Sequence, residues 1–327
     1  MIFALAACRV TWGVPEAADC EGDAPSGDVW IYTSIYPEVV AKLDADLRRR
    51  FPGLEPHFLQ AGSEKVALRY EAELAAGGSP ACVLATSDPA WIDNLARRGV
   101  LIPHLAPNVL HLAREHVHPD GLWTTLRHGL VVLGTHSDVA DAPQSFADLM
   151  HPRFAGRLSS GDPSASGSAF TLWSTLVHDQ GWPYVEALDD AGLIAAGGNG
   201  AVLARIASRE RDVGLLLLEN LLDGQRRGDP VTVVFPSDGA VLVPGPIAIP
   251  AGCPNPLAAR AVIDTWLSPE GQALLVDGGM YAVLPGLPPP TGAPPLGTVA
   301  VRPFGPDRLD VDGAAFKARF LSILDGP

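Results

Sequence analysis

The sequence predicts an α/β protein in which a mostly parallel sheet is flanked by helices. Two observations lead to this fold class. Short apolar, strand-like runs alternate along the chain with stretches whose apolar residues have helical spacing. The strand-like runs also end repeatedly in Ser, Thr, Asn or Gly, just before the helical pattern begins. Since strand ends and helix starts share one edge of such a sheet, we expect these polar residues to converge on one crevice.

The first hundred residues show the alternation most clearly. Pro37 favours a helix start, because proline is tolerated in the first helical turn. The hydroxyl of Ser63 can cap a second helix, and Asp88 followed by Pro89 is typical of a third helix start. The predicted strands are residues 29–32, 56–59 and 82–85, and the predicted helices begin at Pro37, Ser63 and Asp88.

The second part of the chain continues the pattern with longer strands. Two extended runs, 122–126 and 130–135, are expected on either side of Arg127-His128-Gly129, and a loop rich in Ser and Gly follows at 159–168. Further strands are expected at 213–218, 231–235 and 241–249, and helices from Ala169, from Asn199, and at 256–267, 270–277 and 312–324. The proline-rich stretch 285–295 is expected to be a loop or an extended arm.

Composition narrows the functional classes. The chain has 327 residues, of which 47% are hydrophobic, so two domains with packed cores are possible. A charged fraction of only 18% argues against disorder. The net charge of −14, without any basic stripe, argues against nucleic-acid binding. No run approaches the ~20 apolar residues that a helix needs to span a bilayer.

The four cysteines are Cys8, Cys20, Cys82 and Cys253, and their spacing matches no zinc or redox motif. We therefore expect no metal site. Cys82 lies in an apolar run and is interpreted as a small buried apolar side chain. Neither Cys20 nor Cys253 has an evident partner.

Leu5-Ala6-Ala7-Cys8 resembles a bacterial lipobox, in which the cysteine thiol is lipidated and becomes the mature N-terminus. The stretch 9–28 that follows has no periodicity, as expected of a tether. This pattern predicts a lipid anchor at Cys8 and a location outside the cytoplasmic membrane. Residues 1–4 supply no basic region ahead of the motif, so either the true start lies upstream or the match is a chance one.

A series of short motifs then follows in a definite order. They are Tyr32-Thr33-Ser34-Ile35-Tyr36, Ala61-Gly62-Ser63-Glu64-Lys65-Val66, Thr86-Ser87-Asp88-Pro89, Ser166-Gly167-Ser168-Ala169-Phe170, Ala195-Ala196-Gly197-Gly198-Asn199, Pro244-Gly245-Pro246-Ile247-Ala248-Ile249 and Ser268-Pro269-Glu270-Gly271-Gln272. The ordered set resembles the bacterial extracellular solute-binding proteins of ABC importers. Within them it is most similar to the group of ferric, aminoethylphosphonate and hexose-phosphate binders.

The resemblance implies a two-lobed periplasmic-binding-protein fold with a ligand cleft between the lobes. It implies a signal remnant and tether at 1–27, a first lobe at 28–133 with 242–327 (including a C-terminal arm), and a second lobe at 134–241. It also implies a periplasmic or extracytoplasmic monomer that delivers a small anionic ligand to an ABC permease. Apart from the lipid anchor, no contact with the membrane is expected. We also expect no cofactor and no enzymatic activity.

The candidate ligand-binding residues are those that strand ends and helix starts would gather: Ser34, Tyr36, Gly62, Ser63, Ser87, Asp88, Arg127, Ser166, Gly167, Ser168, Asn199, Glu219 and Asn220. Their serine hydroxyls could bind an oxyanion or merely cap helices. Arg127 could clamp an anion or form a salt bridge between the lobes. Glu219 could bind an amine or a sugar hydroxyl of the ligand, or pair with an arginine such as Arg205.

Helix N-termini favour an anionic ligand, and a phosphonate or a phosphate ester fits best. Binding of ferric ion or an iron complex is an alternative within the same family. The adjacent tyrosines that ferric binders carry after the corresponding strand are absent around Glu219-Asn220-Leu221. A Ser-dependent hydrolase is an alternative from another class, although no G-x-S-x-G motif surrounds Ser166.

Overall fold

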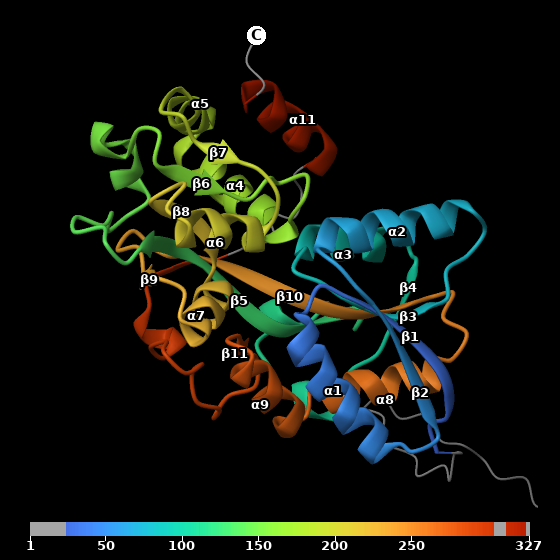
Figure 1. Cartoon of the computed structure of the whole chain (residues 1–327). Helices are drawn as coiled ribbons and strands as arrows, with labels where there is room; N and C mark the ends of the chain where they lie inside the picture. The colour runs from blue at the N-terminus through green and yellow to red at the C-terminus, as the bar shows by residue number, and fades with distance from the viewer. Residues whose placement is uncertain (1–23, 111, 304–311, 325–327) are drawn as a thin grey trace, which may run out of the picture.

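The computed structural model describes residues 24–110, 112–303 and 312–324 of the chain. Cys8 and most of the predicted tether (1–27) lie outside the described residues. Within them the chain forms two α/β lobes on one mixed sheet, with strand order β2-β1-β3-β10-β5-β8-β6-β7 (Figure 1). The predicted fold class is therefore confirmed.

The first lobe contains three parallel strands joined by helices. Its elements are β1 (Gly27–Thr33), α1 (Pro37–Arg50), β2 (Leu54–Gln60), α2 (Ser63–Ala75), β3 (Ala81–Ala85), α3 (Pro89–Arg97) and β4 (Leu101–Ile102). Asp88 caps α3 as predicted, since its carboxylate accepts a hydrogen bond from the backbone N–H of Trp91 at 2.9 Å. The predicted capping role of Ser63 is wrong: Gly62 is the cap of α2, and the Ser63 hydroxyl accepts from the Ser87 N–H instead.

The second lobe repeats the arrangement with shorter strands. Its elements are β6 (Leu158–Ser160), α4 (Gly167–Gln180), α5 (Trp182–Asp190), β7 (Ile194–Ala195), α6 (Asn199–Ala207), β8 (Val213–Leu217), α7 (Leu218–Arg227) and β9 (Val231–Val234). Strand β6 pairs in parallel with both β7 and β8. Helix α7 begins directly after β8, which places Glu219 and Asn220 in its first turn.

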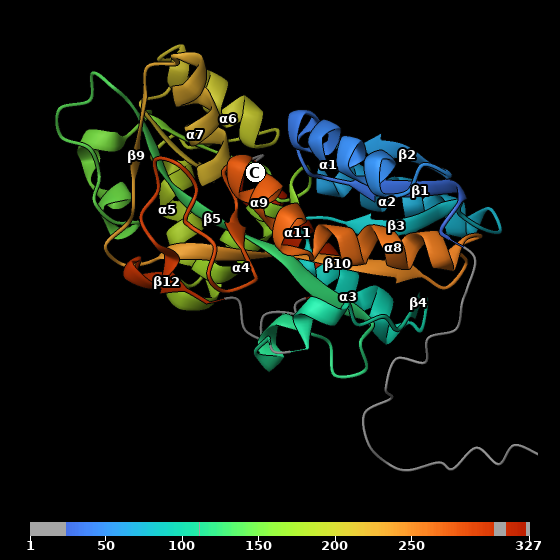
Figure 2. The same ribbon diagram turned by 90° about the horizontal axis from the view of Figure 1, so that it is seen from below.

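Two long antiparallel strands, β5 (Trp123–His136) and β10 (Ala240–Pro250), pass from one lobe to the other (Figure 2). Strand β10 pairs with β3 in the first lobe, and β5 pairs with β8 in the second. The expected break at Arg127-His128-Gly129 is wrong, because β5 is continuous and buried at every residue after Trp123. Arg127 is tolerated in the middle of this buried strand because its guanidinium contacts Ser87 and Glu219 on other segments.

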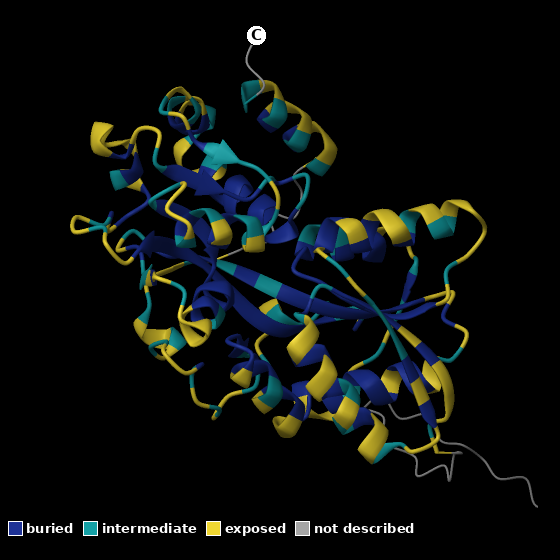
Figure 3. Cartoon of the chain, in the orientation of Figure 1, coloured by how far each residue is buried: buried dark blue, intermediate teal, exposed yellow. Residues whose placement is uncertain are grey.

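Each lobe has an apolar core on both faces of its sheet. In the first lobe the fully buried Trp266 lies in one core and Tyr70 in the other. In the second lobe Trp173 and Leu221 occupy the two corresponding cores. Figure 3 shows the crossing strands largely buried and the exposed residues on the outer surfaces of α1 and α2. Across the described residues, no helix combines the length and the apolar character that crossing a membrane requires.

The remaining elements complete the first lobe and then return to the second. They are α8 (Pro256–Trp266), α9 (Pro269–Asp277), β11 (Tyr281–Ala282), β12 (Val301–Arg302) and α11 (Gly313–Leu324), with short 3-10 helices at Pro107–Val109, Arg114–His116, Ala147–Met150, Pro152–Phe154 and Leu296–Thr298. The stretch 285–295 contains neither helix nor strand, in agreement with the predicted loop or extended arm.

The last helix lies on the second lobe and reaches the first. The rings of Phe316 and Phe320 pack against those of Trp182 and Trp173, with centroids 4.8 Å and 5.0 Å apart. On the same helix, Lys317 Nζ lies 2.7 Å from Glu64 Oε1 of α2. The C-terminal helix thus connects both lobes, whereas the lobe boundaries at 133/134 and 241/242 stay predictions.

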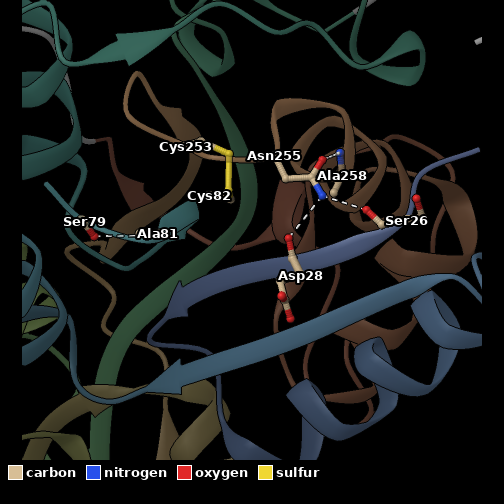
Figure 4. The surroundings of a disulfide bond; sticks show 8 residues. All are labelled: Ser26, Asp28, Ser79, Ala81, Cys82, Cys253, Asn255 and Ala258. Carbon is tan, nitrogen blue, oxygen red and sulfur yellow. Dashed lines mark hydrogen bonds between the residues drawn. A yellow bond between two sulfur atoms is a disulfide. The ribbon is translucent and has the colours of Figure 1, made fainter. Parts of the chain in front are cut away.

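A disulfide joins Cys82 of β3 to Cys253, just after β10 (Figure 4). Cys82 is buried in an apolar core as predicted, but it is bonded to Cys253, so the expectation that Cys253 has no evident partner is wrong. The pairing escaped prediction because the two residues are 171 positions apart and only the antiparallel contact of β10 with β3 brings them together. Beside it, Asn255 Nδ2 donates to the carbonyl oxygen of Ser26 at 2.8 Å and so holds the start of β1.

Removing the disulfide should destabilise the first lobe, because a cross-link between distant residues restricts the unfolded chain. We expect the double variant Cys82→Ala/Cys253→Ala to lose about 2–5 kcal/mol of unfolding free energy, measured by urea denaturation. The Cys20→Ala variant is the matched control and should unfold as the wild type does. Equal unfolding midpoints for all three proteins would show that the bridge does not stabilise the fold.

Candidate functional site

A cavity of about 200 Å³ lies between the two lobes, at the carboxyl ends of the parallel strands. The first lobe lines it with the last residue of β2 and with residues that follow β1, β2 and β3, namely Gln60, Ser34, Tyr36, Ala61, Gly62, Ser63 and Ser87. The second lobe lines it with the starts of α4 and α6 and the end of β8, namely Ala165, Ser166, Ser168, Gly198, Asn199, Gly200 and Leu217. We call this cavity the interlobe pocket.

Three helices begin at the interlobe pocket: α2 after Gly62, α4 after Ser166 and α6 after Gly198. The first backbone N–H groups of a helix have no partner inside the helix and carry a partial positive charge. Since three such ends meet at one cavity, the electrostatic field of the backbone favours an anion there.

On the first-lobe side, Ser87 is the centre of a hydrogen-bond network. Its backbone N–H donates to the hydroxyl oxygens of Ser34 and Ser63, both at 3.1 Å. Its own hydroxyl oxygen accepts a hydrogen bond of 2.6 Å from Arg127 Nη2. The three hydroxyls are thereby held side by side, although they come from three different turns of the chain.

On the second-lobe side, Asn199 fixes the geometry. Its Nδ2 donates to Ser168 Oγ at 2.9 Å, and its Oδ1 accepts from the Leu217 N–H at 3.1 Å. The hydroxyls of Ser168 and Ser166 are 3.0 Å apart, and Ser166 also caps α4 by accepting from the Ala169 N–H. The end of β8 and the starts of α4 and α6 therefore form one connected wall.

Arg127 and Glu219 form a buried pair behind the interlobe pocket. Arg127 Nη1 and Glu219 Oε1 are 3.7 Å apart, and both side chains are almost completely excluded from solvent. Neither these two atoms nor Glu219 Oε2 makes a hydrogen bond in the described structure. Burial raises the pKa of Glu219 to about 7, and the positive charge of Arg127 opposes this rise. Arg205, the partner suggested by the sequence, instead contacts Ser159 and the carbonyl oxygen of Ala196.

The two lobes touch each other around the interlobe pocket. Tyr36 Oη of the first lobe donates a 2.5 Å hydrogen bond to Asn220 Oδ1 of the second, and burial raises the pKa of the Tyr36 hydroxyl. A side chain at Gly167 would place its Cβ only 2.7 Å from the Cβ of Asp88. Glycine at position 167 is therefore what allows α4 to approach the first lobe so closely.

The structure gathers most of the predicted residues at the interlobe pocket and places the others just behind it. Lining the pocket are Ser34, Tyr36, Gly62, Ser63, Ser87, Ser166, Ser168 and Asn199. Arg127, Glu219, Asn220, Gly167 and Asp88 do not line it but contact residues that do, or one another. Whether any of them binds a ligand stays a prediction.

Six further lining residues were not predicted: Gln60, Ala61, Ala165, Gly198, Gly200 and Leu217. Each directly precedes or follows a predicted residue or belongs to the same turn, so extending each motif by one or two positions would have found them.

Asp88 faces a second cavity of about 780 Å³ together with Glu64 and Lys317. Burial and the mutual repulsion of the two carboxylates raise the pKa of Glu64, and burial raises that of Asp88. Asp88 is thus occupied with capping α3 and with this acidic pair, which explains why it does not face the interlobe pocket.

The described residues offer no support for the hydrolase alternative. Among them, no histidine forms a hydrogen bond with a serine of the interlobe pocket, and Ser166 interacts with Ser168 and Ala169. A serine nucleophile requires an adjacent base. Elsewhere, Asp28, Glu55 and His57 bring ligand atoms within 4.8 Å of one another at the opposite, exposed end of β1 and β2. This group is not connected with the interlobe pocket.

A sequence model of the family described as bacterial extracellular solute-binding protein matches residues 83–297. A Haemophilus influenzae protein is 25% identical over 233 residues, which are 66% of this chain and 66% of that protein. The chain therefore spans about two thirds of the length of this curated relative.

Solved structures with the same fold cover nearly the whole chain. The substrate-binding protein of an ABC transporter from Agrobacterium tumefaciens has a TM-score of 0.81 at 19% identity, covering 93% of this chain and 96% of that one. AfuA from Actinobacillus pleuropneumoniae, with fructose-6-phosphate bound, has a TM-score of 0.77 at 19% identity, covering 92% of this chain and 97% of that one. Iron-bound HitA from Pseudomonas aeruginosa has a TM-score of 0.77 at 18% identity, covering 92% of this chain and 99% of that one.

The buried carboxyl of Glu219 should make stability depend on pH. Because its pKa is raised on folding, the folded state holds a proton that the unfolded chain releases, so stability falls as the pH rises from about 4.5 to 7. We expect the unfolding free energy of the wild type to fall relative to that of Glu219→Gln by about 3 kcal/mol over this range. Urea denaturation at pH 4.5, 6 and 8 measures it. The control is Glu186→Gln, which replaces an exposed carboxylate. If the unfolding free energies of Glu219→Gln and the wild type differ by the same amount at every pH, the assignment of a raised pKa to Glu219 is wrong.

Proposed function

Because the chain belongs to the family of bacterial extracellular solute-binding proteins, we propose that it captures a small organic anion between its two lobes and delivers it to an ABC permease. The ligand we propose is a phosphonate or a phosphate ester. The observation that carries this proposal is the interlobe pocket, where five serine hydroxyls, an asparagine amide and three helix N-termini meet.

The lining favours an oxyanion over a cation. No Asp, Glu or His is among the described residues that line the interlobe pocket, whereas hydroxyl and N–H donors come from both lobes. The Arg127–Glu219 pair behind it compensates its own charge, so the helix ends supply the net field. An anion with several acceptor oxygens can bond to donors of both lobes at once.

Ferric iron is the competing ligand within the family. A hard trivalent cation requires several anionic oxygen ligands. The interlobe pocket contains one tyrosine, Tyr36, whose hydroxyl already donates to Asn220. Two of the protein's relatives in fold carry different ligands, iron in one and fructose-6-phosphate in the other. The donor set supports the second type of ligand, and a volume of about 200 Å³ suits a small head group.

Capture requires no covalent step. The crossing strands β5 and β10 connect the lobes, and changes in their backbone angles would open and close the cleft. The Tyr36–Asn220 hydrogen bond and the approach of Gly167 to Asp88 are contacts that exist only when the lobes are together. The proposed residues therefore bind and enclose the ligand and do not transform it.

The family is extracellular, and the Cys82–Cys253 disulfide is consistent with an oxidising compartment. We propose further that the protein acts as a monomer and is anchored to the membrane by a lipid on Cys8. Two results would support the lipid anchor. Globomycin should block the processing of the N-terminus, and a Cys8→Ser variant should no longer associate with the membrane.

Isothermal titration of the purified protein with methylphosphonate, glycerol 3-phosphate, fructose 6-phosphate and ferric citrate tests the ligand class. We expect binding of at least one phosphorus-containing anion and none of iron. Ser87→Ala should weaken that binding roughly 10- to 100-fold, because one charge-supported hydrogen-bond donor is lost. Ser208→Ala, at the exposed position that directly follows α6, is the matched control. Iron binding without binding of any phosphorus-containing anion would overturn the proposal.

A further inference from the structure

Helix α11 belongs to the second lobe through its apolar face (Figure 1). Phe316 and Phe320 are only 7% and 0% exposed, and their rings pack against aromatic rings of α4 and α5. The ring of Phe316 also lies edge-on to that of Phe170, with the centroids 5.4 Å apart. Because all these partners are second-lobe residues, we expect α11 to move with the second lobe when the cleft opens.

Lys317 extends from the same helix to the first lobe. Its Nζ donates to Glu64 Oε1 of α2 at 2.7 Å, and it lies 5.1 Å from the centroid of the Phe170 ring on α4. The side chain of Lys317 is 25% exposed, so its contact with Glu64 is partly shielded from solvent. A cation carried by the second lobe is thus placed on an acidic group of the first.

Glu64 belongs to a pair of carboxylates that the second lobe covers. Glu64 and Asp88 are 8% and 3% exposed, and both face the second cavity, which residues of both lobes line. Gly167 of α4 approaches Asp88, and Lys317 of α11 contacts Glu64. Bringing the lobes together therefore removes water from two like charges, which is unfavourable unless a cation accompanies them.

Lys317 supplies that cation. Burial and the repulsion by Asp88 raise the pKa of Glu64, and burial raises the pKa of Asp88, while the positive charge of Lys317 opposes the rise at both. Arg97, the other cation among the described residues that line the second cavity, pairs with Asp93. The two carboxylates therefore depend on Lys317 for charge compensation when the lobes are together.

The two carboxylates lie directly behind the interlobe pocket. Ser63 and Ser87 line that pocket, and the next residue in each turn, Glu64 or Asp88, faces the second cavity. A ligand inside the interlobe pocket and Lys317 outside it therefore act on the same two turns of the first lobe. Since Lys317 does not line the pocket, the structure connects it with binding through the position of the lobes.

We propose that α11 is an interlobe strap, whose Lys317 stabilises the closed arrangement of the two lobes even before a ligand binds. Lys317 is then a positioning residue: it sets the fraction of molecules in which the interlobe pocket is complete, and with it the ligand affinity. The effect on affinity rests on the proposed function, whereas the effect on the lobes requires no ligand.

Spin-label distances in the ligand-free protein test the strap directly. One label is placed at Ala72→Cys on α2 and the other at Ala204→Cys on α6, which are exposed positions on opposite lobes. Cys8→Ser and Cys20→Ser in all proteins leave the labels as the free thiols beside the native disulfide. Measurement at pH 8 keeps both carboxylates ionised once the lobes open.

We expect the wild type to show a closed and an open population without ligand. Lys317→Met keeps an unbranched side chain and removes its charge. It should lower the ratio of closed to open molecules roughly 10-fold, because a charge-assisted hydrogen bond in a partly exposed position is lost. A wild type that is entirely open without ligand, or equal ratios in the two proteins, would overturn the inference.

Two further variants separate the strap from a general effect of charge. Lys42→Met is the matched control, because it removes an exposed lysine–aspartate pair, that with Asp277, within the first lobe. It should keep the wild-type ratio. Lys317→Met combined with Glu64→Gln removes both charges of the contact and should return the ratio to within about 3-fold of the wild type. Failure of this rescue would show that Lys317 does not act through Glu64.

Titration calorimetry with methylphosphonate, glycerol 3-phosphate and fructose 6-phosphate measures the consequence for binding. In Lys317→Met, the affinity for each anion that the wild type binds should fall by the same factor as the closed fraction. Weaker binding with unchanged ligand-free distances would mean that the charge of Lys317 attracts the anion directly, and would contradict the inference. If none of these anions binds to the wild type, the proposed function fails, while the distances still decide on the strap.

Discussion

The position of Arg127 on a strand shared by both lobes is the constraint on which the rest of the site depends. Its guanidinium holds the Ser87 hydroxyl of the first lobe at 2.6 Å and faces the Glu219 carboxylate of the second at 3.7 Å. A buried cation is tolerated only with such partners. Strand β5 therefore combines the connection between the lobes with the buried charge pair and the hydrogen bond to Ser87 in a single segment.

Local sequence signals were sufficient for the elements and for the gathering of the site. Pro37 and Asp88-Pro89 mark helix starts correctly, and the serines after β1 and β3 reach one cavity because parallel strands bring their ends to the same edge. These features depend only on neighbouring residues and on the handedness rules of α/β folds. The family resemblance added the two lobes, which spacing alone did not show.

Features that depend on distant segments were not predictable. The continuity of β5 through Arg127 requires Ser87 and Glu219, and the hydroxyl of Ser63 binds the N–H of Ser87 where local sequence suggested a cap. Whether Asp88 faces the interlobe pocket or its neighbour depends on Glu64 and Lys317, which are far apart in sequence. Single-sequence patterns carry no information about such pairings.

The Cys82–Cys253 bridge has a consequence for the order in which the molecule matures. The two cysteines are 171 positions apart, so Cys82 emerges from the ribosome or a translocation channel long before its partner exists. Cys20, which precedes it, is then the nearest available thiol. A premature Cys20–Cys82 cystine must be exchanged before the Cys82–Cys253 bridge can form, so oxidative maturation requires thiol reshuffling whenever the wrong pair forms first.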